Sequence, residues 1–222
     1  MPSDGFLHKY FLNNGHKPLH KWLHYFDVYE HHFERFRHRP VTMIEIGVAS
    51  GGSLAMWRDY FGPQSRIIGI DVNPACKVNE ADGIEIHIGS QDDTDLLDRI
   101  LALHPVIDIV LDDGSHMMRH QIATFQHLYP RISPRGVYMV EDLHTSYWDD
   151  YEGGLRRPGT FIEFSKDLLD SLNAVHTRGS APITDFTTST FSISAYDSII
   201  AFERRPQGKR QDAITGPSKE LR

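Results

Sequence analysis

Short apolar segments, rich in isoleucine and valine, recur through the middle of the chain and are separated by longer amphipathic segments. Each apolar segment has the length and composition of a buried strand, whereas residues 54–61, 92–103 and 118–129 have the spacing of amphipathic helices. Strands that alternate with helices are typical of a mostly parallel sheet with right-handed crossovers. The predicted strands cover residues 41–46, 66–70, 84–88, 106–111 and 137–140.

The C-terminal part of the chain adds elements of a different kind. Residues 161–175 are predicted to form a helix, and residues 186–193 and 197–202 alternate between apolar and polar side chains. Paired as a hairpin, these two segments would complete the sheet with an antiparallel strand. The predicted fold class is therefore α/β, with a Rossmann-like, doubly wound sheet that is mostly parallel and contains one antiparallel strand, plus N-terminal helices.

Aromatic and leucine side chains recur at helical spacing before the first strand, from Leu19 to Phe36. This stripe predicts helices that pack on the sheet or form a lid over its edge. His20 and His24 would share one helical face, and we interpret them as exposed or stacked histidines rather than as zinc ligands. The predicted organisation is a helical lid or oligomerisation segment at 1–40, the sheet domain at 41–205 and a disordered tail at 206–222.

The composition is that of a soluble globular protein, with 40% hydrophobic and 24% charged residues. A formal net charge of −7 disfavours nucleic acid or an anionic membrane as a partner. No apolar run is long enough to span a bilayer, and the first residues lack the pattern of a signal peptide. Because the single cysteine, Cys76, excludes an intrachain disulfide, a reducing, cytoplasmic location is expected.

A turn of small residues, from Glu45 to Ser53, separates the first strand from its helix, and Ser53 is a candidate cap for that helix. Glycines at 47, 51 and 52 would let a ligand approach the backbone and the free N–H groups of the helix N-terminus. Their spacing matches neither the nicotinamide-binding fingerprint nor a phosphate-binding P-loop.

Polar side chains also follow the second and third strands. Asp71 ends the second strand, where a carboxylate is placed to accept both ribose hydroxyls of a nucleoside. Ser90 and Gln91 follow the third strand, where they could hydrogen-bond to an adenine edge or cap the next helix. Together with the glycine turn, these residues predict a nucleoside ligand at this edge of the sheet.

Two acidic clusters lie one strand–helix unit apart: Asp112-Asp113-Gly114-Ser115-His116 follows the fourth strand, and Glu141-Asp142 follows the fifth. Side chains just beyond neighbouring strand ends converge on one crevice of an open α/β sheet. Because carboxylates packed so closely repel, a divalent cation that prefers oxygen ligands is expected among them, Mg²⁺ first and Mn²⁺ or Ca²⁺ otherwise. Consecutive aspartates point to opposite sides of a strand, so one can face the nucleoside and the other the metal.

These residues resemble the class I S-adenosylmethionine-dependent methyltransferases and, more closely, the metal-dependent sugar O-methyltransferases of antibiotic biosynthesis. The resemblance extends from about Tyr25 to Glu203. Macrolide-modifying members also carry a long N-terminal domain, absent from this sequence, that contributes to assembly and substrate binding. The specific parts are the two acidic clusters, Glu45 to Val48, Gly69 to Asp71, Leu143 to Trp148 and Tyr196 to Ile199.

The resemblance implies a role for each group. Asp113, Glu141 and Asp142 would bind Mg²⁺, and His116 would be the general base for a sugar hydroxyl. Tyr147 and Trp148 are candidates for stacking on the acceptor. The implied partners are a small glycosylated acceptor and further copies of the chain in a homo-oligomer. The expected S-adenosylmethionine site comprises Glu45, Gly47, Ser50, Gly51, Ser53, Asp71, Ser90, Gln91 and Asp112.

The leading hypothesis is Mg²⁺-dependent O-methylation of a sugar on a glycosylated secondary metabolite. N-methylation of an aminosugar, or O-methylation of a catechol or polyketide, would use the same fold. A chelator would distinguish amine methylation, because an amine needs no metal activation. The base and metal set disfavours a nucleotide-binding module without turnover. A hydroxylase is also disfavoured, since no 2-His-1-carboxylate triad is evident.

Overall fold

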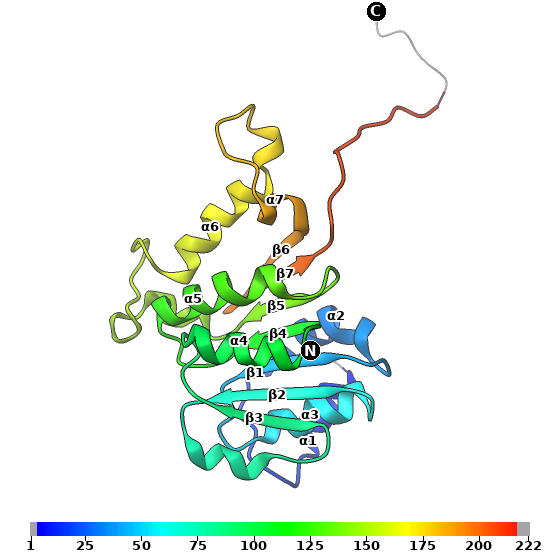
Figure 1. Ribbon diagram of the computed structural model, residues 1–222, viewed down its shortest axis with the longest axis vertical. Coiled ribbons are helices and arrows are strands. Elements are labelled where there is room, and N and C mark those ends of the chain that lie inside the picture. Colours follow the sequence, from blue (N-terminus) through cyan, green and yellow to red (C-terminus); the bar gives the residue numbers. More distant parts are fainter. Residues whose placement is uncertain (1–3, 217–222) are drawn as a thin grey trace, which may run out of the picture.

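The computed structural model describes residues 4–216 and contains a seven-stranded sheet with helices on both faces (Figure 1). The strand order is β3-β2-β1-β4-β5-β7-β6. The first five strands are parallel, and β7 runs antiparallel between β5 and β6, which confirms the predicted fold class. The strands are β1 (Thr42–Ile46), β2 (Arg66–Asp71), β3 (Ile84–Ile88), β4 (Ile109–Asp112), β5 (Val137–Val140), β6 (Thr190–Tyr196) and β7 (Ile199–Arg204).

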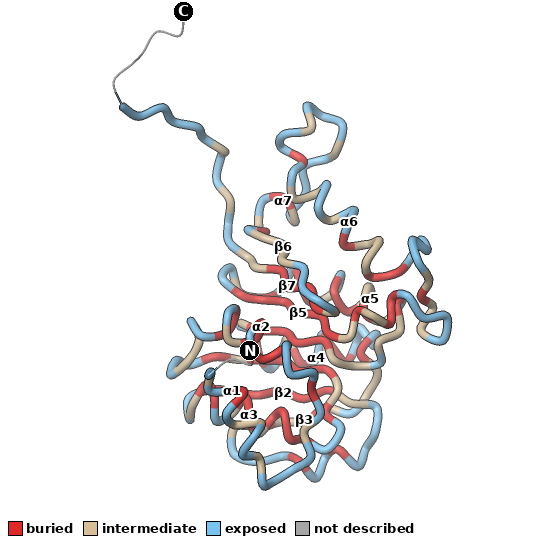
Figure 2. Tube along the Cα trace, turned by 180° about the vertical axis from the view of Figure 1, so that it is seen from behind, coloured by how far each residue is buried: buried red, intermediate tan, exposed pale blue. Residues whose placement is uncertain are grey.

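Side chains alternate along each strand, so the sheet has two buried faces, and each is covered by its own helices. Met43 packs with the first three helices, whereas its neighbour Ile44 packs with the next three. Figure 2 shows the central strands buried between these layers. The helices are α1 (Phe6–Leu12), α2 (Tyr25–Phe33) and α3 (Gly52–Phe61) on one face, α4 (Thr94–Leu103), α5 (Met118–Leu128) and α6 (Phe161–Leu172) on the other, and the short α7 (Asp185–Ser189).

The register of the parallel strands determines where the polar residues meet. Ile46 of β1 pairs with Ile70 of β2 and with Asp112 of β4, and Asp112 pairs with Val140 of β5. The loops that carry the predicted site residues therefore leave the same edge of the sheet. The strand order also reverses between β1 and β4, and ligands of open α/β sheets bind at such a switch point.

The N-terminal region differs from the single aromatic stripe that its spacing suggested. Helices α1 and α2 are separated by residues 13–24, which contain neither helix nor strand. Gly15 and Pro18 explain this break, because glycine weakens a helix and proline disfavours helical backbone at the residue before it. Consequently His20 and His24 do not share a helical face, and neither belongs to a group of converging metal ligands among residues 4–216.

Two further elements depart from expectation at the C-terminal end. Residues 186–189, predicted as part of a strand, lie in α7, because Thr184 and Thr187 form a reciprocal capping box that starts a helix there. Residues 205–216 contain neither helix nor strand and are mostly exposed (Figure 2), while the last part of the predicted tail, 217–222, lies outside the described residues. Among residues 4–216, no helix is both long and apolar enough to cross a membrane.

Candidate active site

The glycine turn after β1 requires glycine for steric reasons at one position above all. Gly47 has φ +93°, and a Cβ atom there would lie 2.0 Å from the carbonyl oxygen of Asp113. Gly51, at φ +75°, precedes α3 and takes the cap position predicted for Ser53. The Ser53 hydroxyl instead donates a 2.8 Å hydrogen bond to Glu45. The turn therefore lies directly against the first acidic cluster.

Asp71 is fixed by the backbone of this turn. Its Oδ2 accepts hydrogen bonds from the N–H groups of Val48 and Ala49, at 2.9 and 3.1 Å, and its Oδ1 accepts one from Asn73 at 2.8 Å. Partial burial would raise the pKa of Asp71, but these three donors outweigh it and hold the pKa below its ordinary value. Asp71 is thus an ionised acceptor held in one orientation beside the glycine turn.

Gln91 and Asp112 form a buried network beneath the strand ends. The Gln91 amide donates to both carboxylate oxygens of Asp112, at 3.0 and 3.1 Å, and accepts from the backbone N–H of Ser115 at 2.8 Å. Complete burial raises the pKa of Asp112 to about 7. These hydrogen bonds hold the Gln91 side chain in one orientation at the strand ends.

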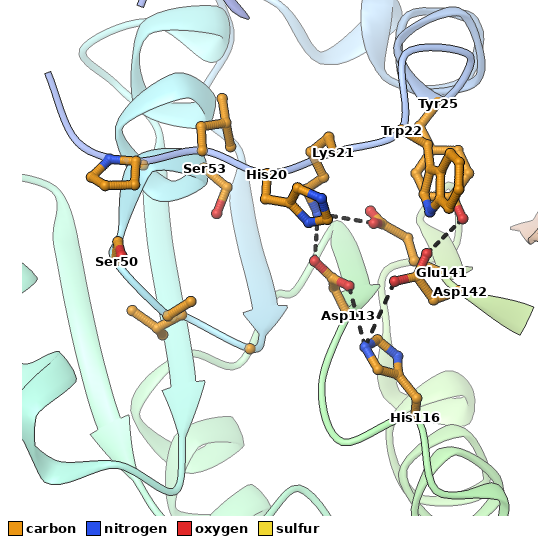
Figure 3. A pocket seen from close by; sticks show the side chains of 16 residues that line it. His20, Lys21, Trp22, Tyr25, Ser50, Ser53, Asp113, His116, Glu141 and Asp142 are labelled. Atoms are coloured by element: carbon orange, nitrogen blue, oxygen red, sulfur yellow. Dashed lines mark hydrogen bonds and ion pairs between the residues drawn. The ribbon is translucent and has the colours of Figure 1, made fainter. Parts of the chain in front are cut away.

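Two clefts open at this edge of the sheet, and Gly47 lines both. The Asp71 cleft, of about 350 Å³, includes Gly47, Asp71, Ser90, Gln91, Gly114 and His120. The acidic cleft, of about 330 Å³, includes Lys21, Tyr25, Ser50, Ser53, Asp113, His116, Glu141 and Asp142 (Figure 3). Three residues that were expected to contact a ligand line neither cleft and are buried: Glu45, Gly51 and Asp112.

His116 faces two carboxylates at the floor of the acidic cleft (Figure 3). Its Nε2 lies 3.9 Å from Asp113 Oδ1 and 3.8 Å from Asp142 Oδ2, distances too long for hydrogen bonds. Its Nδ1 is buried and finds no hydrogen-bond partner among residues 4–216. The imidazole is therefore held near two acceptors with an unsatisfied nitrogen, an arrangement suited to proton transfer.

The backbone at both His116 and Asp142 is in the left-handed region, with φ of 56° and 53°. Such backbone is costly for residues other than glycine and persists only where the surroundings impose it. The buried Thr145 hydroxyl lies 2.7 Å from the Asp142 carbonyl and 3.5 Å from that of His116. Thr145 therefore links the two strained residues, and their strain is local to the predicted site.

Two tyrosines of α2 hold the second acidic pair. The Tyr25 hydroxyl donates to Asp142 Oδ1, and the Tyr29 hydroxyl donates to Glu141 Oε1, both at 2.6 Å. The aromatic spacing predicted that these rings would pack on the sheet, which they do, but gave no sign of these hydrogen bonds. Helix α2 therefore orients both carboxylates that follow β5.

Lys21 is the site residue that the sequence did not reveal. Its Nζ lies 2.6 Å from Asp113 Oδ2, 2.9 Å from Glu141 Oε2 and 3.9 Å from Glu45 Oε1, and its side chain is 3% exposed. A lysine in a polar segment ordinarily indicates a solvated position. Only the helical lid predicted for the N-terminal segment could have suggested that such a residue reaches the strand ends.

One ammonium cannot neutralise three carboxylates, of which Glu45 and Glu141 are buried and Asp113 is partly exposed. Burial raises the pKa of Glu141 to about 8 and that of Glu45 to about 7, with repulsion by Asp113 adding to both. Burial alone would lower the pKa of Lys21, but the surrounding carboxylates outweigh it and keep the pKa well above its ordinary value. The cluster therefore holds a charged lysine and retains protons on some of its acids near neutral pH.

The donor set fits a hard divalent cation. One oxygen of Asp113, one of Asp142 and a nitrogen of His116 lie within 4.8 Å of one another. Mg²⁺ commonly takes one or two carboxylates and keeps several of its waters, so Asp113 and Asp142 are sufficient. The structure does not bring Glu141 into this group, because its two oxygens face Lys21 and Tyr29.

Exposed aromatic side chains continue outward from the acidic cleft. The Trp148 ring lies 4.7 Å from the ring of His144 and 6.0 Å from that of Tyr151, and Trp22 lies 6.1 Å from His144. Tyr147, Trp148 and Trp22 are each half exposed. We refer to Trp22, His144, Trp148 and Tyr151 as the aromatic rim. Of the two acceptor candidates, Trp148 belongs to this rim.

A second group of converging ligands lies at the opposite end of the sheet. Glu85 and His87 of β3 approach His104, which follows α4. Here a cation is already paired with the carboxylate, since Arg66 Nη1 lies 3.2 Å from Glu85 Oε1 and 3.4 Å from His104 Nδ1. We interpret this group as an ion-paired network that links β2, β3 and the end of α4.

No protein-family model matches the chain. Among curated proteins, it is 44% identical over 162 residues to 8-demethyl-8-(2-methoxy-alpha-L-rhamnosyl)-tetracenomycin-C 3'-O-methyltransferase of Streptomyces olivaceus, which covers 68% of this chain and 41% of that enzyme. Mycinamicin VI 2''-O-methyltransferase of Micromonospora griseorubida is 37% identical over 167 residues, 70% of this chain and 41% of the enzyme. The chain is a homologue of antibiotic-pathway sugar O-methyltransferases. It spans less than half the length of these two relatives.

A solved structure extends this relationship to the fold. The MycE methyltransferase of the mycinamycin biosynthetic pathway, in complex with Mg, SAH and mycinamycin VI, superposes with a TM-score of 0.79 at 28% identity. The match covers 96% of this chain and 56% of MycE. The N-terminal helices and the sheet of this chain therefore have counterparts in a methyltransferase that was solved with Mg, SAH and mycinamycin VI.

Proposed function

We propose that this chain is an S-adenosylmethionine- and Mg²⁺-dependent O-methyltransferase that acts on a sugar hydroxyl of a glycosylated secondary metabolite in antibiotic biosynthesis. One observation carries the proposal: His116 Nε2 lies 3.8 to 3.9 Å from two carboxylates, in a cleft that shares Gly47 with the Asp71 cleft. The homology with sugar O-methyltransferases and the Mg and SAH of MycE support it.

The two clefts suit the two halves of the methyl donor. Asp71 would accept the ribose hydroxyls, and Ser90 and Gln91 would line the base. The glycine turn and the N-terminus of α3, from Gly47 to Ser53, would receive the methionine end, with its backbone N–H groups near the carboxylate. In this proposal the sulfonium methyl group would lie near the boundary between the clefts, on the side of His116.

The residues of the acidic cleft would prepare the acceptor. Bound Mg²⁺ would orient a sugar hydroxyl and lower its pKa. Asp113 and Asp142 would hold the metal, with Glu141 as a further ligand. His116 would take the hydroxyl proton as the oxygen attacks the methyl carbon in line, and the bond from that carbon to sulfur would break and leave SAH. The aromatic rim, with Tyr147 beside it, would stack on the rings of the acceptor.

The cellular location and the partners of the chain are also proposed. We propose a cytoplasmic enzyme with a small glycosylated acceptor as its partner, and neither nucleic acid nor membrane; the net charge of −7 supports this choice. A homo-oligomer is proposed on the family resemblance.

Calorimetric titration with S-adenosylmethionine, with and without EDTA, tests the donor site. Transfer of labelled methyl to a panel of rhamnosylated polyketides and aminosugar glycosides tests the reaction. We expect donor binding to survive EDTA and in Asp113→Ala, and transfer to sugar hydroxyls to require Mg²⁺. Transfer to amines that resists EDTA would favour N-methylation instead. Absence of donor binding under every condition would overturn the methyltransferase proposal.

A further inference from the structure

Lys21 is a buried ammonium among groups that we assign to a divalent metal. Lysine is almost never so deeply buried unless it is paired, and here its partners are Asp113, after β4, and Glu141, after β5. The ring of Tyr29 lies beside it, with the ammonium 5.8 Å from the ring centroid. Figure 3 shows the side chain entering the cleft from above these strand ends. Lys21 therefore occupies the position of a cation in this cluster.

The lysine is carried by residues 13–24, which join α1 to α2 and which we call the strap. Across the described chain, no backbone N–H of residues 15–24 donates to a backbone carbonyl. Side chains and close packing hold it instead: Lys17 Nζ lies 2.8 Å from Asn79 Oδ1, and the Pro18 carbonyl lies against Gly52. Segments with so few backbone hydrogen bonds open at low free energy, so the strap can detach without unfolding the sheet.

The Lys21 ammonium and a divalent cation would compete for these carboxylates, because the two positive charges repel each other at this short range and use lone pairs of the same oxygens. Lys21 holds Asp113 Oδ2 and Glu141 Oε2, while Tyr29 holds the other oxygen of Glu141. With Lys21 in place, only Asp113 Oδ1 and Asp142 Oδ2 remain directed toward His116. Departure of the lysine would therefore favour the binding of Glu141 to a metal.

We infer that Lys21 is an internal competitor of the divalent metal, so that metal loading releases the strap from the acidic cleft. This inference rests on the metal site of the proposed function. Because Lys21, Trp22 and Leu19 of the strap line the cleft, its release would also widen the approach to His116. Metal binding would then both complete the ligand set and open the acceptor side.

Titration of the full chain with Mn²⁺ tests the competition. We expect Lys21→Met to bind Mn²⁺ at least tenfold more tightly than wild type. The matched control, Lys9→Met, removes an exposed lysine of α1 that pairs with Asp4 rather than with the acids of the cleft, and should leave the affinity unchanged. Equal affinity in all three proteins would overturn the inference while preserving the metal site. Weaker Mn²⁺ binding by Lys21→Met than by wild type would also overturn the inference. Absence of Mn²⁺ binding to all three proteins would overturn the proposed metal site as well.

Tryptic cleavage of wild type supplies a second readout that needs no variant. The Lys21–Trp22 bond can be cut only when the buried Lys21 side chain leaves the cluster. Mn²⁺ should therefore increase cleavage at this bond severalfold, measured by mass spectrometry, while cleavage after the exposed Lys166 of α6 stays constant. Unchanged or reduced cleavage after Lys21 would contradict release of the strap, even if Lys21→Met does not fold.

Discussion

The two clefts at the sheet edge are built by different means. In the Asp71 cleft, the carboxylate is held by backbone N–H groups of a turn only 22 and 23 positions earlier in the chain. In the acidic cleft, Lys21 reaches Asp113 and Glu141 across 92 and 120 positions, and α2 supplies two tyrosine hydroxyls. The first cleft is therefore formed by neighbouring strand ends of the sheet and the loops that follow them, whereas the second depends on the docking of the N-terminal region. We expect the two to respond separately to mutation.

Replacement of His116 should give the largest effect and separate the clefts most clearly. His116→Asn removes the nitrogen that faces Asp113 and Asp142, and general-base catalysis typically contributes a factor of about 10²–10⁴ in rate. Single-turnover methyl transfer should fall by that factor while donor affinity stays within about twofold. His127→Asn, in the helix α5 that follows His116 and paired with Asp98, is the control and should leave both unchanged. Loss of donor affinity in His116→Asn would show that the clefts are not independent.

The Asp71 cleft could be predicted from the sequence because its determinants are local. The glycine turn and Asp71 follow recognisable strands, and a parallel sheet brings those strand ends to one edge. The same rule correctly brought Asp113, His116 and Asp142 together. Lys21 could not be predicted, because its position depends on the path of an irregular strap rather than on periodicity. The orientation of Glu141 was missed for the same reason, since Lys21 and Tyr29 determine it.

Asp71→Asn should give the converse result. The amide replaces one of the two oxygens that together accept three backbone N–H groups, so its own N–H donor then faces at least one of them. The charge is also removed, and the side chain should no longer be held toward the proposed ribose site. We expect donor affinity to fall about 10- to 100-fold in calorimetry, with Mn²⁺ affinity unchanged. The exposed Asp82, paired with Arg58, provides the control Asp82→Asn. A parallel loss of Mn²⁺ affinity would contradict a division between the clefts.

Stability should depend on pH through the far end of α2. A hydrogen bond from His32, aided by Arg35, outweighs partial burial and lowers the pKa of Glu203 from 4.5 to about 2. A carboxyl whose pKa is lower in the folded state stabilises the fold above its unfolded pKa, and this contribution is lost as the pH falls toward 2. Glu203→Gln should therefore lower the free energy of unfolding, measured with urea at pH 7, by on the order of 2 kcal/mol.

The difference in free energy of unfolding between wild type and Glu203→Gln should become progressively smaller below pH 4.5, because protonation of Glu203 then removes the same contribution from wild type. Glu163→Gln, in an exposed pair with Lys166, should show little difference at any pH. A constant difference between wild type and Glu203→Gln from pH 7 to pH 3 would assign the loss to packing rather than to ionisation. Because α2 also positions Tyr25 and Tyr29, the loss should weaken Mn²⁺ binding more than donor binding.

The smallest effect is expected at the aromatic rim, which we assign to the acceptor alone. Aromatic stacking contributes about 0.5–1.5 kcal/mol, so Trp148→Ala should raise the acceptor KM about 2- to 10-fold. Tyr147→Ala should raise it by less, because Tyr147 lies beside the rim rather than within it. Donor and Mn²⁺ affinities should not change in either variant. Phe191→Ala, which removes a similarly exposed ring from β6, controls for general surface effects. An unchanged acceptor KM in both Tyr147→Ala and Trp148→Ala would indicate that the acceptor binds to another wall of the acidic cleft. The remaining aromatic surface is then Trp22, which lies in the strap.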